Sequence, residues 1–179
     1  MLLTLGSGHG QKDSYLTYTH PDSTFTLRYP NDWKVTKQED GKVLFTPNVD
    51  TSKVSGESSR VIVFGPTISV TIKRPMYPKQ TSIEVCDTFV NFLKNTGYAA
   101  HNEEKILPNV SDKVCMVQFN IKGERIEAMH GERNNHPGMV FVIRHGDLVF
   151  LIGYETTVNY YFNKYLPAME QVINSFRIL

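Results

Sequence analysis

Apolar and polar residues alternate along the first part of the chain, which is the pattern of β-strands that are buried on one face. Phe25, Leu27 and Tyr29 lie on one side of a strand that begins at Thr24 and ends at a turn over residues 30–32. The same reasoning predicts further strands over 33–35, 42–46, 61–64 and 68–73, a hairpin turn at 40–41 and a polar loop over 47–60.

A capped helix is predicted after these strands. Thr81 and Glu84 have the spacing of a capping box, in which each side chain hydrogen-bonds the other residue's backbone N–H. The apolar residues then recur every three or four positions, as on one face of a helix, at 83, 86, 89, 90 and 93. Gly97 provides the left-handed residue that ends such a helix.

Five extended segments follow, over 101–106, 114–121, 125–133, 139–144 and 148–154. Residues 139–143 and 148–152 are apolar at every position, whereas a strand with one exposed face alternates. A tight turn over 145–147 joins these two strands, so they are antiparallel. We therefore expect both to be covered by helices on opposite faces of the sheet.

The C-terminal segment can provide the second covering helix. It carries an apolar stripe at 165, 166, 169, 172, 173 and 176. Because proline is tolerated best in the first turn, Pro167 predicts a helix that starts near Leu166, after an irregular lead-in over 157–165. The predicted fold class is thus α/β (α+β), an α/β/α sandwich around one central antiparallel sheet.

The N-terminal residues do not fit this pattern. Residues 1–5 are apolar but are followed at once by a Gly-rich stretch, without the basic region and the longer apolar run of a signal peptide. We expect residues 1–14 to be a disordered leader, either left by cloning or tethering a removed export segment. A single domain is then expected over residues 15–179.

Composition narrows the class of protein. The chain has 179 residues, 40% of them hydrophobic, which is typical of a globular domain and excludes wholesale disorder. Its 19 basic and 18 acidic residues give a formal net charge of +1, so no electrostatic argument favours nucleic acid or an anionic membrane. No apolar run reaches the roughly 18–20 residues of a membrane-spanning helix.

The two ends of the predicted domain carry motifs of a known family. Residues 25–33, FTLRYPNDW, resemble the F-x-[IL]-x-Y-P-x-x-W start of the PsbP-like superfamily. Residues 161–176 resemble its closing helix, which ends in I-x-S-F. The resemblance spans about residues 18–178, and it implies the PsbP-like α/β/α fold. These motif residues have structural roles, so they identify a fold without identifying a site.

The resemblance also carries expectations about function. The superfamily includes an extrinsic photosystem II subunit, a nuclear-import factor that binds the Ran GTPase, and exported prokaryotic proteins of unknown role, almost none of them enzymes. The photosystem subunit has a basic N-terminal arm, whereas residues 1–20 here contain Lys12 as their one basic residue. This departure favours the exported prokaryotic branch.

The resulting expectation is a non-catalytic accessory or binding protein that lies outside the cytoplasm, in a periplasmic, extracellular or lumenal space. We expect a protein partner, no cofactor, no nucleic acid, no small-molecule substrate and at most peripheral contact with a membrane. Two alternatives stay open. One is a metal-dependent or metal-handling protein, and the other is a GTPase-binding factor of the nuclear-import type.

The metal alternative depends on one cluster of polar residues. Strand alternation places His130 and Glu132 on one face, His136 lies in the adjoining turn, and His145 lies at the far end of the next hairpin. Imidazole and carboxylate groups bind divalent transition metals, but a full ligand set is not evident. A solvated strand end is the favoured interpretation, so we assign no catalytic residue and keep His130, Glu132 and His136 only as metal candidates.

Two further groups of residues allow more than one interpretation. Cys86 and Cys115 both face apolar layers, so they are either buried thiols or a disulfide, which an exported protein would favour. An aromatic run near the C-terminus either forms a binding surface or, as favoured here, caps the open end of the sheet. That run comprises Tyr154, Tyr160, Tyr161, Phe162 and Tyr165.

Overall fold

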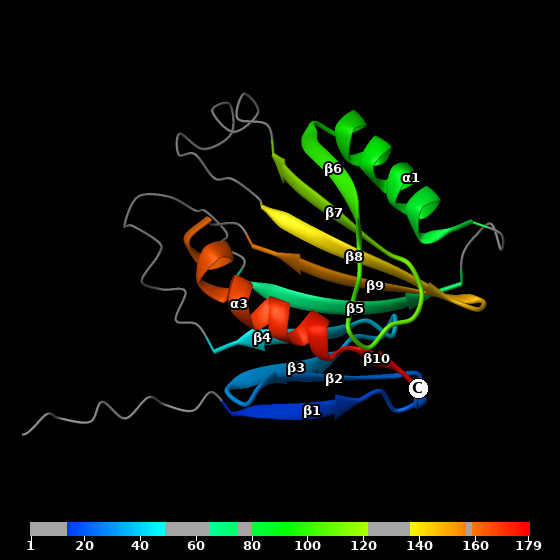
Figure 1. Ribbon diagram of the computed structural model, residues 1–179. Helices are drawn as coiled ribbons and strands as arrows, with labels where there is room; N and C mark the ends of the chain where they lie inside the picture. The colour runs from blue at the N-terminus through cyan, green and yellow to red at the C-terminus, as the bar shows by residue number, and fades with distance from the viewer. Residues whose placement is uncertain (1–13, 49–64, 75–79, 122–136, 157–158) are drawn as a thin grey trace, which may run out of the picture.

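The computed structural model describes residues 14–48, 65–74, 80–121, 137–156 and 159–179. These residues form two antiparallel sheets and two helices, α1 (Ser82–Asn95) and α3 (Asn159–Ser175) (Figure 1). The three-stranded sheet has the order β1 (Tyr15–Thr19), β2 (Phe25–Pro30), β10 (Arg177–Ile178). The seven-stranded sheet has the order β3 (Trp33–Lys37), β4 (Val43–Pro47), β5 (Thr67–Lys73), β9 (Leu148–Glu155), β8 (Gly138–His145), β7 (Val114–Ile121), β6 (Tyr98–Lys105).

The seven-stranded sheet separates two apolar clusters. Val114 and Met116 of β7 belong to a cluster with α3 and the three-stranded sheet, whereas Cys115 and Val117 belong to a cluster with α1. Because successive strand residues point to opposite faces, α1 and α3 cover opposite faces of the sheet. The predicted sandwich is confirmed.

The β8–β9 hairpin lies inside the sheet, between β5 and β7. Phe141 and Phe150 are buried on the α3 side, and Val142 and Val149 are buried on the α1 side. The prediction that both strands are covered on both faces is therefore confirmed. The predicted segments 61–64 and 125–133, and most of the loop over 47–60, lie outside the described residues.

The prediction of a single sheet is wrong. The strand that carries the family's opening motif, β2, pairs with β1 and β10 in a sheet of its own. The end of α3 is bonded to the same strand, since the Oγ of its last residue, Ser175, accepts a hydrogen bond from the Arg28 N–H of β2 at 2.8 Å. The sequence pattern did not show β1, whose exposed residues do not alternate with buried ones.

The first helix has the predicted ends. The Glu84 N–H donates to Thr81 Oγ1 at 3.3 Å, and the Thr81 N–H donates to Glu84 Oε2 at 2.7 Å. The Thr81 N–H, and to a lesser extent the Thr81 hydroxyl, which donates to Glu84 Oε2 at 3.1 Å, lower the pKa of the Glu84 carboxyl. At the other end, Thr96 caps the helix and Gly97 has a φ of +95°, a conformation that glycine adopts without strain.

The predicted start of the C-terminal helix is wrong, because α3 begins at Asn159 and contains Pro167 in its interior. Aromatic packing holds the segment before the proline in helical form. The Tyr154 hydroxyl lies 3.1 Å from the Tyr161 carbonyl oxygen and 2.9 Å from that of Phe162, and the Phe162 ring stacks on the Tyr154 ring at 4.9 Å. These contacts act against the cost of an interior proline, which is roughly 3 kcal/mol.

Tyr154 is suited to this role because it stays protonated. Its side chain is fully buried, and desolvation raises the pKa of the phenol well above its usual range, with a smaller effect from the charge of Tyr165. The hydroxyl therefore remains a hydrogen-bond donor throughout the neutral pH range.

Gly138, at the start of β8, provides a test of the packing between α1 and the sheet. A Cβ at this position would overlap the ring of Phe119, which cannot move freely because Phe89 and Tyr98 contact it edge-on at 6.3 and 5.8 Å. We expect Gly138→Ala to lower the free energy of unfolding by about 1–3 kcal/mol. Urea denaturation followed by tryptophan fluorescence measures this change.

The matched control is Gly65→Ala. A Cβ at Gly65 would meet no atom within 4 Å, so the free energy of unfolding should change by no more than about 0.5 kcal/mol. Equal effects of the two substitutions would contradict this account of the packing.

Candidate functional site

The metal candidates from the sequence, His130, Glu132 and His136, lie outside the described residues, so that hypothesis stays a prediction. His145 is described, and its Nδ1 lies 2.8 Å from the Asp112 carboxylate, which precedes β7. In the part of the chain that the structure describes, no three His, Cys, Asp or Glu residues are grouped to hold a metal ion.

The aromatic run is largely interior. Tyr154 and Tyr161 are buried, while Phe162 and Tyr165 pack against the core, where Tyr165 meets Trp33 edge-on at 5.8 Å. The side chain of Tyr160 lies outside the described ones. The four described rings therefore close the core around the start of α3, as expected of a cap.

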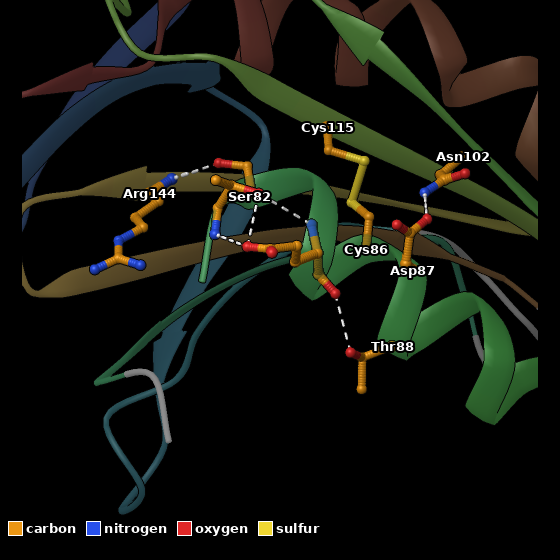
Figure 2. The surroundings of a disulfide bond; sticks show 9 residues. Ser82, Cys86, Asp87, Thr88, Asn102, Cys115 and Arg144 are labelled. Atoms are coloured by element: carbon orange, nitrogen blue, oxygen red, sulfur yellow. Dashed lines mark hydrogen bonds between the residues drawn. A yellow bond between two sulfur atoms is a disulfide. The ribbon is translucent and has the colours of Figure 1, made fainter. Parts of the chain in front are cut away.

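The two cysteines form a disulfide between α1 and β7 (Figure 2). Their Cα atoms are 6.4 Å apart and neither side chain is exposed to solvent. The alternative of two free thiols is thereby excluded for this structure. Disulfides persist in oxidising compartments and are rare in the cytosol, so this bond bears on where the protein works.

Polar contacts around the disulfide fix α1 further (Figure 2). The Asn102 amide donates to the Asp87 carboxylate at 2.8 Å, and Ser82 Oγ accepts from the Arg144 N–H at 3.1 Å. The Arg144 guanidinium also donates to the carbonyl oxygen of Gln80, just before the helix. The α1 layer is thus joined to the sheet by one covalent bond and by hydrogen bonds from two strands.

A polar groove of about 690 Å³ lies on the other side of the molecule, between α3 and the three-stranded sheet. Ser175 links its two walls, since its Oγ accepts from the Arg28 N–H and lies 2.8 Å from the Val172 carbonyl oxygen. The Asn109 amide donates to the Asn174 carbonyl oxygen at 2.7 Å and closes one end. The lining residues are Thr17, Thr26, Leu27, Arg28, Asn109, Pro167, Glu170, Gln171, Asn174, Ser175 and Arg177.

Two arginines set the charge of this groove. Arg28 and Arg177 are exposed, and no carboxylate within the described ranges forms an ion pair with either. The Arg28 guanidinium lies 5.7 Å from the centroid of the Tyr15 ring, a cation–π contact that orients it. The groove also contains one acidic residue, Glu170, so its lining is net positive.

The groove has the chemistry of a binding surface. Its hydroxyl and amide side chains can hydrogen-bond a peptide, and its arginines can bind carboxylates. Two of its hydroxyls are already engaged by the backbone: Ser175 Oγ bonds β2 and α3, and Thr26 Oγ1 donates to the Tyr18 carbonyl oxygen at 2.8 Å. The described lining residues include no imidazole, the group that activates the nucleophile in many hydrolases, and no thiol, which can serve as the nucleophile.

Sequence reasoning missed this groove. Its two walls come from the ends of the chain, with Arg28 and Ser175 separated by 147 positions. The signals available in the sequence were the two family motifs, since the opening motif contains Arg28 and the closing motif contains Ser175.

Comparison with known proteins places the fold. No known family model and no curated protein sequence matches the chain. Solved structures that are similar to this chain include the cyanobacterial PsbP, CyanoP, of Synechocystis sp. PCC 6803. The TM-score is 0.59 at 15% identity, over 98% of this chain and 99% of CyanoP. The chain has the PsbP-like fold.

Two other similar structures have different roles. The Ran-binding protein Mog1p of Saccharomyces cerevisiae has a TM-score of 0.56 at 9% identity, over 92% of this chain and 95% of Mog1p. LpqN of Mycobacterium tuberculosis, involved in cell envelope biogenesis, has a TM-score of 0.53 at 14% identity, over 92% of this chain and 90% of LpqN. At these identities the likeness establishes the fold alone. Neither helix in the described ranges is long and apolar enough to cross a membrane.

The disulfide generates a stability prediction. Cys86 and Cys115 are 29 positions apart, and a crosslink over a loop of this length stabilises by about 3–4 kcal/mol through the entropy of the unfolded chain. We expect the double variant Cys86→Ala/Cys115→Ala to lose about that much in urea denaturation. The control is dithiothreitol, which should destabilise the wild type and leave the double variant unchanged. A wild type insensitive to full reduction would contradict the prediction.

Proposed function

We propose that this chain is a non-catalytic accessory protein of a prokaryote, exported from the cytoplasm, that binds a protein partner through the groove between α3 and the three-stranded sheet. The observation that carries the proposal is the pair of exposed arginines in that groove without carboxylate partners among the described residues. A groove with surplus positive charge is complementary to an acidic segment of a partner.

The partner's binding mode follows from the lining. A segment in the groove meets the exposed face of β2 on one side and the polar face of α3 on the other. The amides of Gln171 and Asn174 can hydrogen-bond its backbone, while Arg28 and Arg177 pair with its carboxylates. The fold is compatible with this role, because a protein of the same fold, Mog1p, is Ran-binding.

The buried disulfide supports the proposed location, because such bonds persist outside the reducing cytosol. It favours export over a GTPase-binding role inside the cell. We further propose that the working domain comprises residues 15–179, with residues 1–14 as its leader, since the first strand begins at Tyr15.

The location is tested by trapping thiols in cells of the source organism. Acid-quenched cells are treated with N-ethylmaleimide, then reduced and labelled with a polyethylene-glycol maleimide. We expect Cys86 and Cys115 to take up the second label quantitatively, because their thiols are oxidised in the native compartment. Labelling by the first reagent instead would show free thiols and would favour the intracellular alternative.

The partner site is tested with the charge reversal Arg28→Glu/Arg177→Glu. Both side chains are exposed, so the free energy of unfolding should change by no more than about 0.5 kcal/mol per site. Capture of the partner from the extracytoplasmic fraction should weaken roughly tenfold, which corresponds to about 1.4 kcal/mol. Wild-type capture should also weaken as salt rises, because exposed ion pairs are screened.

The matched control is Lys34→Glu/Lys37→Glu, which makes the same charge change on exposed residues of β3, in the other sheet. It should leave capture unchanged. Equal loss in both double variants would attribute binding to overall charge and would contradict a site in the groove.

A further inference from the structure

A second pocket, of about 410 Å³, lies on the α3 side of the β6–β7 pair. His101 of β6 lies opposite Gln118 of β7 in the antiparallel register, and Asn120 is two residues further along β7. These three side chains lie on the face of β7 that carries Met116, and Phe162 of α3 also lines the pocket. Three polar side chains from adjacent strands thus converge on one space.

One polar atom of this pocket lacks a partner within the described part of the chain. Asn120 Oδ1 is buried there without a hydrogen bond, whereas Gln118 is partly buried and His101 is exposed to solvent. A buried amide oxygen without a donor reduces stability, and native proteins leave few such groups. Polar groups that are retained against stability are typical of binding sites.

The amide of Asn120 can also reorient. The last torsion of an asparagine side chain is soft, and no hydrogen bond to its oxygen from a described residue opposes the rotation. The amide can therefore turn its oxygen toward the pocket and accept from a ligand, while its nitrogen donates to the same ligand. That paired donor and acceptor is the array with which asparagine binds a nucleobase edge.

The remaining lining defines the class of ligand. No Lys, Arg, Asp or Glu is among the described lining residues, which disfavours phosphates, carboxylates and cations. Phe162 provides an aromatic wall, and its stacking on Tyr154 at 4.9 Å keeps it in place. The volume lies in the range of roughly 300–1,000 Å³ of small-molecule sites.

We propose that this pocket binds a small neutral ring compound with a cyclic amide edge, such as the edge of a pyrimidine base. The N–H and C=O of the cyclic amide pair with the Asn120 side chain, and the ring packs against Phe162. Gln118 and His101 hydrogen-bond the remaining polar atoms of the ligand. This site is separate from the groove that contains Arg28.

The experiment is an NMR titration of the ¹⁵N-labelled protein with uridine, whose base has a cyclic amide edge. We expect amide shifts concentrated at Ala99, Gln118, Asn120 and Phe162, the residues that line the pocket. 3-Methyluridine lacks the N–H donor, so we expect its affinity to be at least about tenfold lower than that of uridine. Absence of shifts with 10 mM uridine, shifts centred elsewhere, or equal binding of both nucleosides would overturn the proposal.

The protein side is tested by Asn120→Leu, which removes the amide and keeps a similar volume. We expect it to weaken uridine binding at least about tenfold while its melting temperature stays equal or rises, because an unsatisfied buried group is lost. The control, Asn102→Leu on the opposite face of β6, removes the hydrogen bond to Asp87 and should leave uridine binding unchanged. A parallel titration with glucose tests a ligand that is neutral and polar but has no cyclic amide. Preferential binding of glucose over uridine, or unchanged uridine binding in Asn120→Leu, would overturn the proposal.

Discussion

Burial of the β8–β9 hairpin on both faces is the constraint on which the rest of the structure depends. Its two strands present apolar side chains in both directions, so each face of the sheet needs a covering layer. α1 provides one layer, and α3 with the three-stranded sheet provides the other. The outer strands then extend the sheet on both sides of the hairpin. The positions of both helices therefore follow from two short apolar segments at the centre.

The elements that the sequence predicted well are those whose cause is local. The capping box at Thr81, the glycine after α1 and the apolar runs of β8 and β9 each depend on neighbouring residues. The start of α3 and the separate three-stranded sheet depend on contacts between elements, namely those of the Tyr154 hydroxyl of β9 with α3 and the pairing of β2 with the C-terminal strand β10. Periodicity carries no information about such contacts, so tertiary packing overrode the expectation from Pro167.

The candidate sites were harder to predict than the fold for the same reason. Burial leaves a periodic pattern, whereas Arg28 and Arg177 become a site only because β2 and β10 pair. The cysteines were placed in apolar layers from the sequence, but their bond required the register of α1 over β7. Asn120 looks like an ordinary strand residue, and only its missing hydrogen-bond partner among the described residues distinguishes it.

The two faces of the sheet are held in different ways. On the α1 side, a disulfide and the hydrogen bonds of Asn102 and Ser82 fix the helix to the sheet. On the α3 side, apolar packing and hydrogen bonds from the Tyr154 hydroxyl, the Arg28 N–H and the Asn109 amide hold the helix. The groove and the second pocket both lie along α3, one lined by its C-terminal half and the other by Phe162. In the functions proposed for the groove and the pocket, the polar side chains that border α3 serve binding, while the apolar residues behind them belong to the larger of the two core clusters.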